Sequence, residues 1–198
     1  MDYNDIDRLV ELILIEYNRI GDEWVKFCPN VRINLKKKLV RDIRNDVGIF
    51  TYISSYRSFL SGSLSTNQFN IPQVSNRVKA QNSLESKIQR YIDNKEEHGL
   101  SPINKCVNDL FGVRIVYSGK IDFEDFKNHI ESQFGLKCIK ALREDYEAIH
   151  IYFKKDNYSF PWELQVWEEC HNHSNLISHH KYKQDYASWE KEAEGGKK

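Results

Sequence analysis

The sequence predicts an α+β fold, built on a mixed β-sheet of about five strands that is flanked by helices and preceded by an N-terminal helical extension. Apolar residues recur at helical spacing near the N-terminus, from Ile6 to Leu14. Further along the chain, strand-like and helix-like segments alternate, and three consecutive strand-like segments end the pattern. We expect residues 1–72 to form helices and a loop that pack on a core formed by residues 73–198.

Each element follows from its local pattern. The expected helices span about residues 5–20, 31–45, 82–97 and 122–134, with a last helix from about 169 towards 189. The expected strands span about residues 73–79, 109–118, 136–142, 146–154 and 160–167. Residues 58–70 are rich in Ser, Asn and Gly, which predicts a loop. Gly135 stands where a left-handed residue would end the preceding helix.

Composition narrows the class of protein. The chain has 198 residues, 40% hydrophobic and 29% charged, and a formal net charge of zero. A nucleic-acid partner would therefore have to meet a local basic patch. The four cysteines form no CxxC pair, which favours free thiols. The N-terminus is acidic and polar, and the longest apolar run is too short to span a bilayer. We expect a cytoplasmic protein with no membrane partner.

Cations gather where a predicted strand leads into a predicted helix. Arg77 and Lys79 are two residues apart and share a face of the strand, while Ser83 and Lys87 are four apart and share a face of the helix. Three cations and a hydroxyl near a helix N-terminus would suit a polyphosphate. The alternative is an ordinary solvated helix face.

Two carboxylates are candidate Mg²⁺ ligands. Glu163 lies mid-strand among large apolar residues, where an unpaired charge is costly, and it shares a face with Gln165 and Trp167. Asp109 precedes the strand that contains Arg114, and strict alternation places it just outside the regular strand. Together the carboxylates could hold Mg²⁺ with substrate phosphates. The alternative is a salt bridge from Asp109 to Arg114.

The stretch "EDYEAIH" places an aromatic ring and an imidazole on one face of a strand. Strict alternation puts Tyr146, Ala148 and His150 together, with Glu147 and Ile149 on the other face. Such a face could be ordinary core. It could equally be the wall of a site that stacks on a ring and holds a polar group.

Two further clusters are less specific. Lys36, Lys37 and Lys38 fall on one part of the helix expected over residues 31–45, and they are either a solvated face or a patch for a phosphate backbone. Cys170 and His173 have the spacing of one zinc-ligand pair, but a second pair with the spacing of a closed site is missing. Zinc is therefore not expected.

Four motifs stand in an order known from one family. They are "RVKAQNSLESK" (Arg77, Lys79, Ser83, Lys87), "DLFGVR" (Asp109, Arg114), "YEAIH" (Tyr146, His150) and "ELQV" (Glu163, Gln165). In this order and spacing they resemble the RelA/SpoT-type synthetase domain, the nucleotidyltransferase-like pyrophosphokinase fold of the alarmone synthetases. The resemblance covers about residues 74–183. No room for a hydrolase domain precedes it, so we expect a small single-domain member.

The resemblance implies how ATP is bound. Arg77 and Arg114 would sandwich the adenine between their guanidinium planes. Lys79, Ser83 and Lys87 would hold the phosphates.

The resemblance also implies the reaction. Asp109 and Glu163 would bind Mg²⁺, and Glu163 would also take the proton from an attacking 3′-hydroxyl. Attack at the β-phosphorus would release AMP and leave a pyrophosphate on the 3′ oxygen of the acceptor. Tyr146 would stack on the acceptor base, His150 would contact its phosphate or sugar, and Gln165 would lie in the same acceptor site.

Three positions bear on which acceptor is used. Members that use guanosine nucleotides usually have Gly where this chain has Asp145, and Arg where it has Trp167. The change to Trp167 removes a fixed cation from a site expected to meet phosphates. Asn172 falls where those members contact guanine, which favours a guanosine acceptor.

A branch of the family consists of toxins that transfer the pyrophosphate to the 3′ CCA end of tRNA and so stop translation. This chain is similar to them in its short length, in "WELQ" followed by an aromatic residue, and in a basic N-terminal patch, here Lys36, Lys37 and Lys38. We favour tRNA as acceptor and an antitoxin as protein partner. The alternatives are GDP or GTP, giving (p)ppGpp, and a catalytically silent nucleotide-binding module.

Overall fold

The computed structural model describes residues 3–65, 68–69, 71–94 and 98–178. Its strands form one sheet in the order β1-β2-β5-β4-β3. They are β1 (Val74–Val78), β2 (Phe111–Tyr117), β3 (Lys137–Arg143), β4 (Tyr146–Phe153) and β5 (Trp162–Glu168). β2 and β5 are parallel, and the other neighbouring strands are antiparallel. The predicted α+β class with a mixed five-stranded sheet is therefore confirmed.

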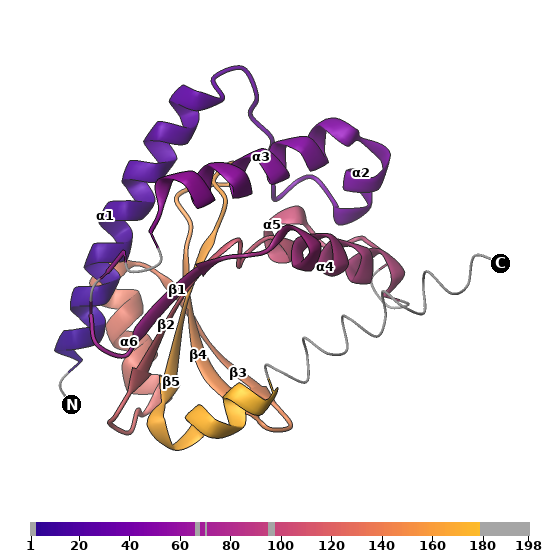
Figure 1. Ribbon diagram of the computed structural model, residues 1–198. Coiled ribbons are helices and arrows are strands. Elements are labelled where there is room, and N and C mark those ends of the chain that lie inside the picture. The colour runs from indigo at the N-terminus through magenta and orange to yellow at the C-terminus, as the bar shows by residue number, and fades with distance from the viewer. Residues whose placement is uncertain (1–2, 66–67, 70, 95–97, 179–198) are drawn as a thin grey trace.

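Helices cover the sheet on both sides (Figure 1). They are α1 (Asn4–Phe27), α2 (Val40–Asn45), α3 (Val47–Ser63), α4 (Gln81–Asp93), α5 (Ile103–Cys106) and α6 (Phe123–Phe134). α1 and α6 lie on one side of the sheet and α4 on the other. Residues 169–178 are also helical, and the rest of the helix expected towards residue 189 lies outside the described residues. Among the described helices, none is long and apolar enough to cross a bilayer.

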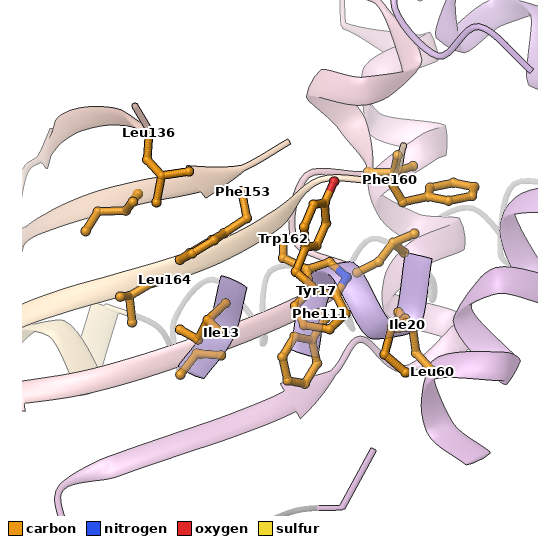
Figure 2. Packing of buried hydrophobic residues seen from close by; sticks show 14 of the residues in the cluster. Ile13, Tyr17, Ile20, Leu60, Phe111, Leu136, Phe153, Phe160, Trp162 and Leu164 are labelled. Atoms are coloured by element: carbon orange, nitrogen blue, oxygen red, sulfur yellow. The ribbon is translucent and has the colours of Figure 1, made fainter. Parts of the chain in front are cut away.

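The hydrophobic core lies between α1 and one face of the sheet. Ile13, Tyr17 and Ile20 continue the apolar stripe of α1, and Trp24 extends it past the predicted end of the helix. Figure 2 shows Ile13, Tyr17 and Ile20 of α1 beside strand residues such as Trp162. Because this face of each strand is apolar, the polar side chains of the alternating positions must project to the other face.

The helix expected over residues 31–45 is wrong for its first part, since the chain is irregular until Val40. The side chain of Asn34 accepts the backbone N–H groups of Lys36 and Lys37 at 3.2 and 3.0 Å. A side chain that bonds nearby backbone in this way competes with the helical pattern. Leu35 is buried, and its N–H donates to the carbonyl of Asn157 at 2.8 Å. A long-range contact and a local turn therefore replace the predicted helix.

Helix α3 was missed by the sequence analysis, and it includes the first part of the loop expected over residues 58–70. Its serines resemble a loop in composition, yet Ile49, Ile53, Tyr56 and Leu60 recur at helical spacing and are buried. Asp46 caps the helix by accepting the N–H of Gly48 at 2.9 Å. The spacing and the cap were the signals that composition concealed.

The end of α6 gives a test of local backbone conformation. Gly135 follows Phe134 with φ of 65°, the left-handed conformation predicted for it, and a Cβ added there would meet nothing within 4 Å. Gly135→Ala should therefore cost about 1 kcal/mol of stability through the backbone alone. Urea unfolding measures the change. Gly62→Ala inside α3, also with open space around the added Cβ, is the matched control and should not destabilise. Equal losses in both variants would contradict this explanation.

Candidate active site

Polar side chains from neighbouring strands meet on the face of the sheet opposite the core. In the strand register, Arg77 lies beside Gly112, Gly112 beside Glu163, and Glu163 beside Tyr152. Paired residues project to the same side of a sheet. With α4 as the facing wall, Arg77, Glu163 and Tyr152 border a cavity of about 460 Å³. One face therefore gathers charged and aromatic groups that are far apart in the sequence.

A second, smaller cavity of about 230 Å³ shares part of its wall with the first. Arg77, Asp109, Glu163 and Gln165 line both cavities. The two carboxylates singled out from the sequence thus border both spaces. This arrangement gives one continuous site with two compartments.

Asp109 lies between two lysines. Its carboxylate oxygens are 2.8 Å from Lys79 Nζ and 2.9 Å from Lys87 Nζ, and the side chains of the three residues are only 11–19% exposed. Burial opposes ionisation of Asp109, but the two ammonium groups outweigh it and hold the pKa of this carboxyl well below its ordinary value. Asp109 precedes β2, as the alternation predicted, and it pairs with these lysines in place of the considered salt bridge to Arg114.

Glu163 is buried and held by two neighbours. It is 5% exposed, with Oε1 3.0 Å from His150 Nδ1 and Oε2 accepting Gln165 Nε2 at 2.8 Å. Burial would raise its pKa, but the hydrogen bond and charge of His150 outweigh this and lower the pKa of Glu163. A carboxylate kept ionised in an enclosed site is suited to accept a proton or to ligate a cation.

Tyr146 and His150 share one face, as the alternation predicted. The hydroxyl of Tyr146 lies 2.8 Å from His150 Nε2, and burial raises the pKa of Tyr146 to about 12. The imidazole also lies 3.3 Å from the hydroxyl of Tyr152, a residue that the sequence analysis did not single out. His150 therefore links the tyrosine rings of the cavity to Glu163.

The guanidinium of Arg114 lies over the indole ring of Trp167. The guanidinium carbon is 3.6 Å from the centre of the indole ring, and Arg114 Nη2 donates to Gln165 Oε1 at 3.5 Å. Burial, and then the charge of Arg77, lower the pKa of Arg114 to about 10. Arg77 and Arg114 both border the smaller cavity, while Ser83 borders the larger one.

The donor set of the site fits a hard divalent cation. Asp109 and Glu163 border the same cavities and are close enough that the charge of Asp109 raises the pKa of Glu163. A cation between them would relieve this repulsion. Oxygen ligands of this kind, completed by water and substrate phosphates, suit Mg²⁺.

Asn172, which was predicted for the acceptor site, does not line either of these cavities. Its neighbour Asn175, which the sequence analysis missed, is fully buried. Asn175 accepts the backbone N–H of Glu147 at 2.9 Å and donates to the carbonyl of Glu147 at 2.7 Å. This pair of hydrogen bonds fixes the helix of residues 169–178 to β4.

Lys36, Lys37 and Lys38 are exposed, but on a turn and not on the helix that was predicted for them. The hydrogen bond of Leu35 to Asn157 holds this turn against the connection between β4 and β5. The three lysines therefore form an exposed basic turn beside that connection.

Two supporting residues carried no sequence signal that distinguished them. Arg57 of α3 donates from Nε to the backbone carbonyl of Lys79 at 2.8 Å. Asn108 accepts from Lys87 Nζ at 3.0 Å. Both fix the cations that surround Asp109. Arg57 and Lys79 are 22 residues apart, so only the packing of α3 on β1 could reveal this contact.

Comparison with solved structures places small alarmone synthetases among the neighbours of this chain. Small alarmone synthetase 1 from Bacillus subtilis is 19% identical over 74% of this chain and 81% of that chain, with a TM-score of 0.40. The same protein bound to its product pppGpp is 17% identical over 73% of this chain and 82% of that chain, with a TM-score of 0.41. Small alarmone synthetase 2 from Bacillus subtilis is 18% identical over 72% of this chain and 81% of that chain, with a TM-score of 0.38.

These neighbours are the family that the sequence motifs resemble. No family model matches the chain, and no curated protein matches it.

The lysines around Asp109 make its charge important for stability. Asp109→Asn leaves two buried ammonium groups without their counter-ion and should cost about 3 kcal/mol at pH 7. The folded pKa is depressed, so this stabilisation is present above the unfolded pKa of about 3.9 and is lost as pH falls towards the folded value. The deficit of Asp109→Asn should therefore shrink below about pH 4.

Urea unfolding at several pH values, without divalent cations, checks this prediction. Glu23→Gln is the matched control, because Glu23 pairs with Arg19 on the exposed side of α1 and should change stability by less than about 1 kcal/mol. A deficit of Asp109→Asn that stays constant down to pH 2 would sink the electrostatic explanation.

Proposed function

We propose that the chain is an ATP-dependent pyrophosphokinase, which transfers the β,γ-pyrophosphate of ATP to a 3′-hydroxyl and releases AMP. The observation that carries the proposal is the meeting of a lysine pair, two carboxylates and two arginines around one continuous site. A phosphoryl-transfer site needs charge neutralisation and alignment more than covalent catalysis. This set of groups supplies both.

The donor would bind between α4 and β1. Lys79, Ser83 and Lys87 border the larger cavity and would take the phosphates of ATP. Arg77 and Arg114 border the smaller cavity and would hold the adenine between their guanidinium planes. Without a substrate, Asp109 neutralises the lysines. Bound phosphates would take over that role.

The acceptor would approach from the side of β4. Its 3′ oxygen would form a bond to the β-phosphorus, the bond from that phosphorus to the α,β-bridging oxygen would break, and AMP would leave with the electron pair. Glu163, kept ionised by His150, would take the hydroxyl proton. Tyr146 would stack on the acceptor base, with His150 and Gln165 beside it. When bound by Asp109 and Glu163, Mg²⁺ would neutralise charge on the phosphate oxygens.

The acceptor that we propose is the 3′ CCA end of tRNA, which would make the chain a translation-inhibiting toxin held by an antitoxin. Trp167 places a buried indole against Tyr146, on the acceptor side of the site, where guanosine-using members of the resembled family have a cation. A terminal adenosine without a 5′ polyphosphate does not require that cation. Lys36, Lys37 and Lys38 form an exposed basic turn that could follow a phosphate backbone.

An acceptor competition tests the reaction and the acceptor together. The protein is incubated with Mg²⁺, γ-labelled ATP, deacylated tRNA, GDP and GTP, and RNA is then separated from nucleotides. We expect label on tRNA that is lost when the 3′ adenosine is removed, and a loss of at least about 100-fold in Glu163→Gln. Label on guanosine nucleotides alone would show an alarmone synthetase. No transfer to any acceptor would leave a silent nucleotide-binding module.

Charge reversal on the basic turn separates a large acceptor from a small one. Lys36→Glu with Lys37→Glu should reduce transfer to tRNA about tenfold or more at low salt, because phosphate contacts are lost, and should leave the KM for ATP unchanged. Arg8→Glu with Lys120→Glu is the matched control, since both are exposed cations, near the start of α1 and after β2. Equal effects of the two double variants would rule out a specific role for the turn.

A further inference from the structure

Six side chains of the site contact one another in a closed ring. Each contacts the next in the order Trp167, Arg114, Gln165, Glu163, His150 and Tyr146, and Tyr146 returns to Trp167. They come from three adjacent strands, β2, β5 and β4. Arg114 belongs to the proposed adenine site, whereas Tyr146, His150 and Gln165 belong to the proposed acceptor site. Trp167 directly contacts one residue of each site, Arg114 and Tyr146.

Trp167 contacts Arg114 and Tyr146 with different parts of its indole. The face of the ring lies 3.6 Å from the guanidinium carbon of Arg114. The Tyr146 ring meets the indole edge-to-face, with 6.0 Å between centroids. The indole N–H also favours ionisation of Tyr146, against the larger effect of burial. Trp167 is 0% exposed, so its position is fixed by packing.

The position of Arg114 depends on the Trp167 indole because few other groups contact its guanidinium. Its Nε is buried without a hydrogen-bond partner among the described residues, and its contact with Gln165 is long, at 3.5 Å. Glu163 attracts Arg114 electrostatically. Without the indole, the guanidinium would be free to turn towards that carboxylate. One face of Arg114 lies on Trp167, which leaves the other face for a planar ligand.

We propose that Trp167 is a positioning residue that couples the two substrate sites. Its indole holds Arg114 in place for the adenine and Tyr146 in place for the acceptor base. This inference rests on the proposed function. Position 167 is thus more than the loss of an arginine, because the tryptophan itself has a role. When one substrate binds, it orders the side chain that it contacts, Arg114 or Tyr146, and through Trp167 this favours binding of the other substrate.

Two substitutions separate the contacts of the indole. Trp167→Phe keeps an aromatic face under Arg114 but loses the N–H, and Trp167→Leu loses both. We expect the KM for ATP to rise about tenfold in Trp167→Leu and less than about threefold in Trp167→Phe. The KM for the acceptor should rise in both variants, whether the wild type uses deacylated tRNA or GDP. kcat at saturation should change less than either KM.

Coupling is measured directly by binding. The Kd of α,β-methylene ATP is determined with and without saturating acceptor in the full-length protein. In the wild type we expect the acceptor to tighten binding at least about fivefold, and in Trp167→Leu we expect a ratio close to one. Trp24→Leu is the matched control, because Trp24 is a buried tryptophan of the core outside the ring. It should lower stability while leaving the coupling ratio unchanged.

The outcomes distinguish the two proposals. If the wild type neither binds the analogue nor transfers pyrophosphate, the proposed function fails. If the wild type is active but shows no coupling, or if Trp167→Leu folds and keeps the wild-type KM values and coupling ratio, the role of Trp167 is overturned. Equal loss of coupling in Trp24→Leu would attribute the effect to stability and overturn it as well.

Discussion

The site depends on charges that are held away from water and must therefore be balanced by one another. Asp109 is enclosed by Lys79 and Lys87, and Glu163 by His150 and Gln165. A buried ion without a partner is strongly unfavourable, so each group fixes the position of the next. The core on the opposite face makes this possible, because α1 and α3 supply the apolar packing that anchors the strands. The apolar packing of the core face therefore supports a face on which buried charges are held in fixed positions.

Much of the fold followed from hydrophobic periodicity. All five strands of the sheet and helices α1, α4 and α6 were expected at their places in the sequence, because each presents an apolar stripe or an alternation. The short helix α5 was not expected, and the larger errors fell between α1 and β1. There the side chain of Asn34 competes with a helix, and the serines of α3 conceal a helical stripe. The turn at Asn34 also depends on a distant contact, the hydrogen bond from Leu35 to Asn157, whereas the signals of α3 are local.

The sequence predicted which side chains of the candidate site share a face of a strand better than it predicted which of them contact one another. Alternation placed Glu163 with Gln165 and Tyr146 with His150, because strand geometry alone determines which residues share a face. It could not show that Asp109 pairs with lysines, or that Trp167 supports Arg114. Those contacts join strands and helices whose spacing is set only when the whole sheet has formed. The roles of these residues in catalysis and binding stay predictions.

The position of β5 has a consequence for biosynthesis. β5 is the last strand of the described chain, yet it lies at the centre of the sheet, between β2 and β4. The β3–β4 hairpin has its own local pairing, and β1 pairs with β2 after α4 and α5, whereas the β2–β5 pair joins residues about fifty positions apart. Glu163, Gln165 and Trp167 therefore enter the site late. A nascent chain would therefore lack an assembled site until β5 has left the ribosome and paired with β2 and β4.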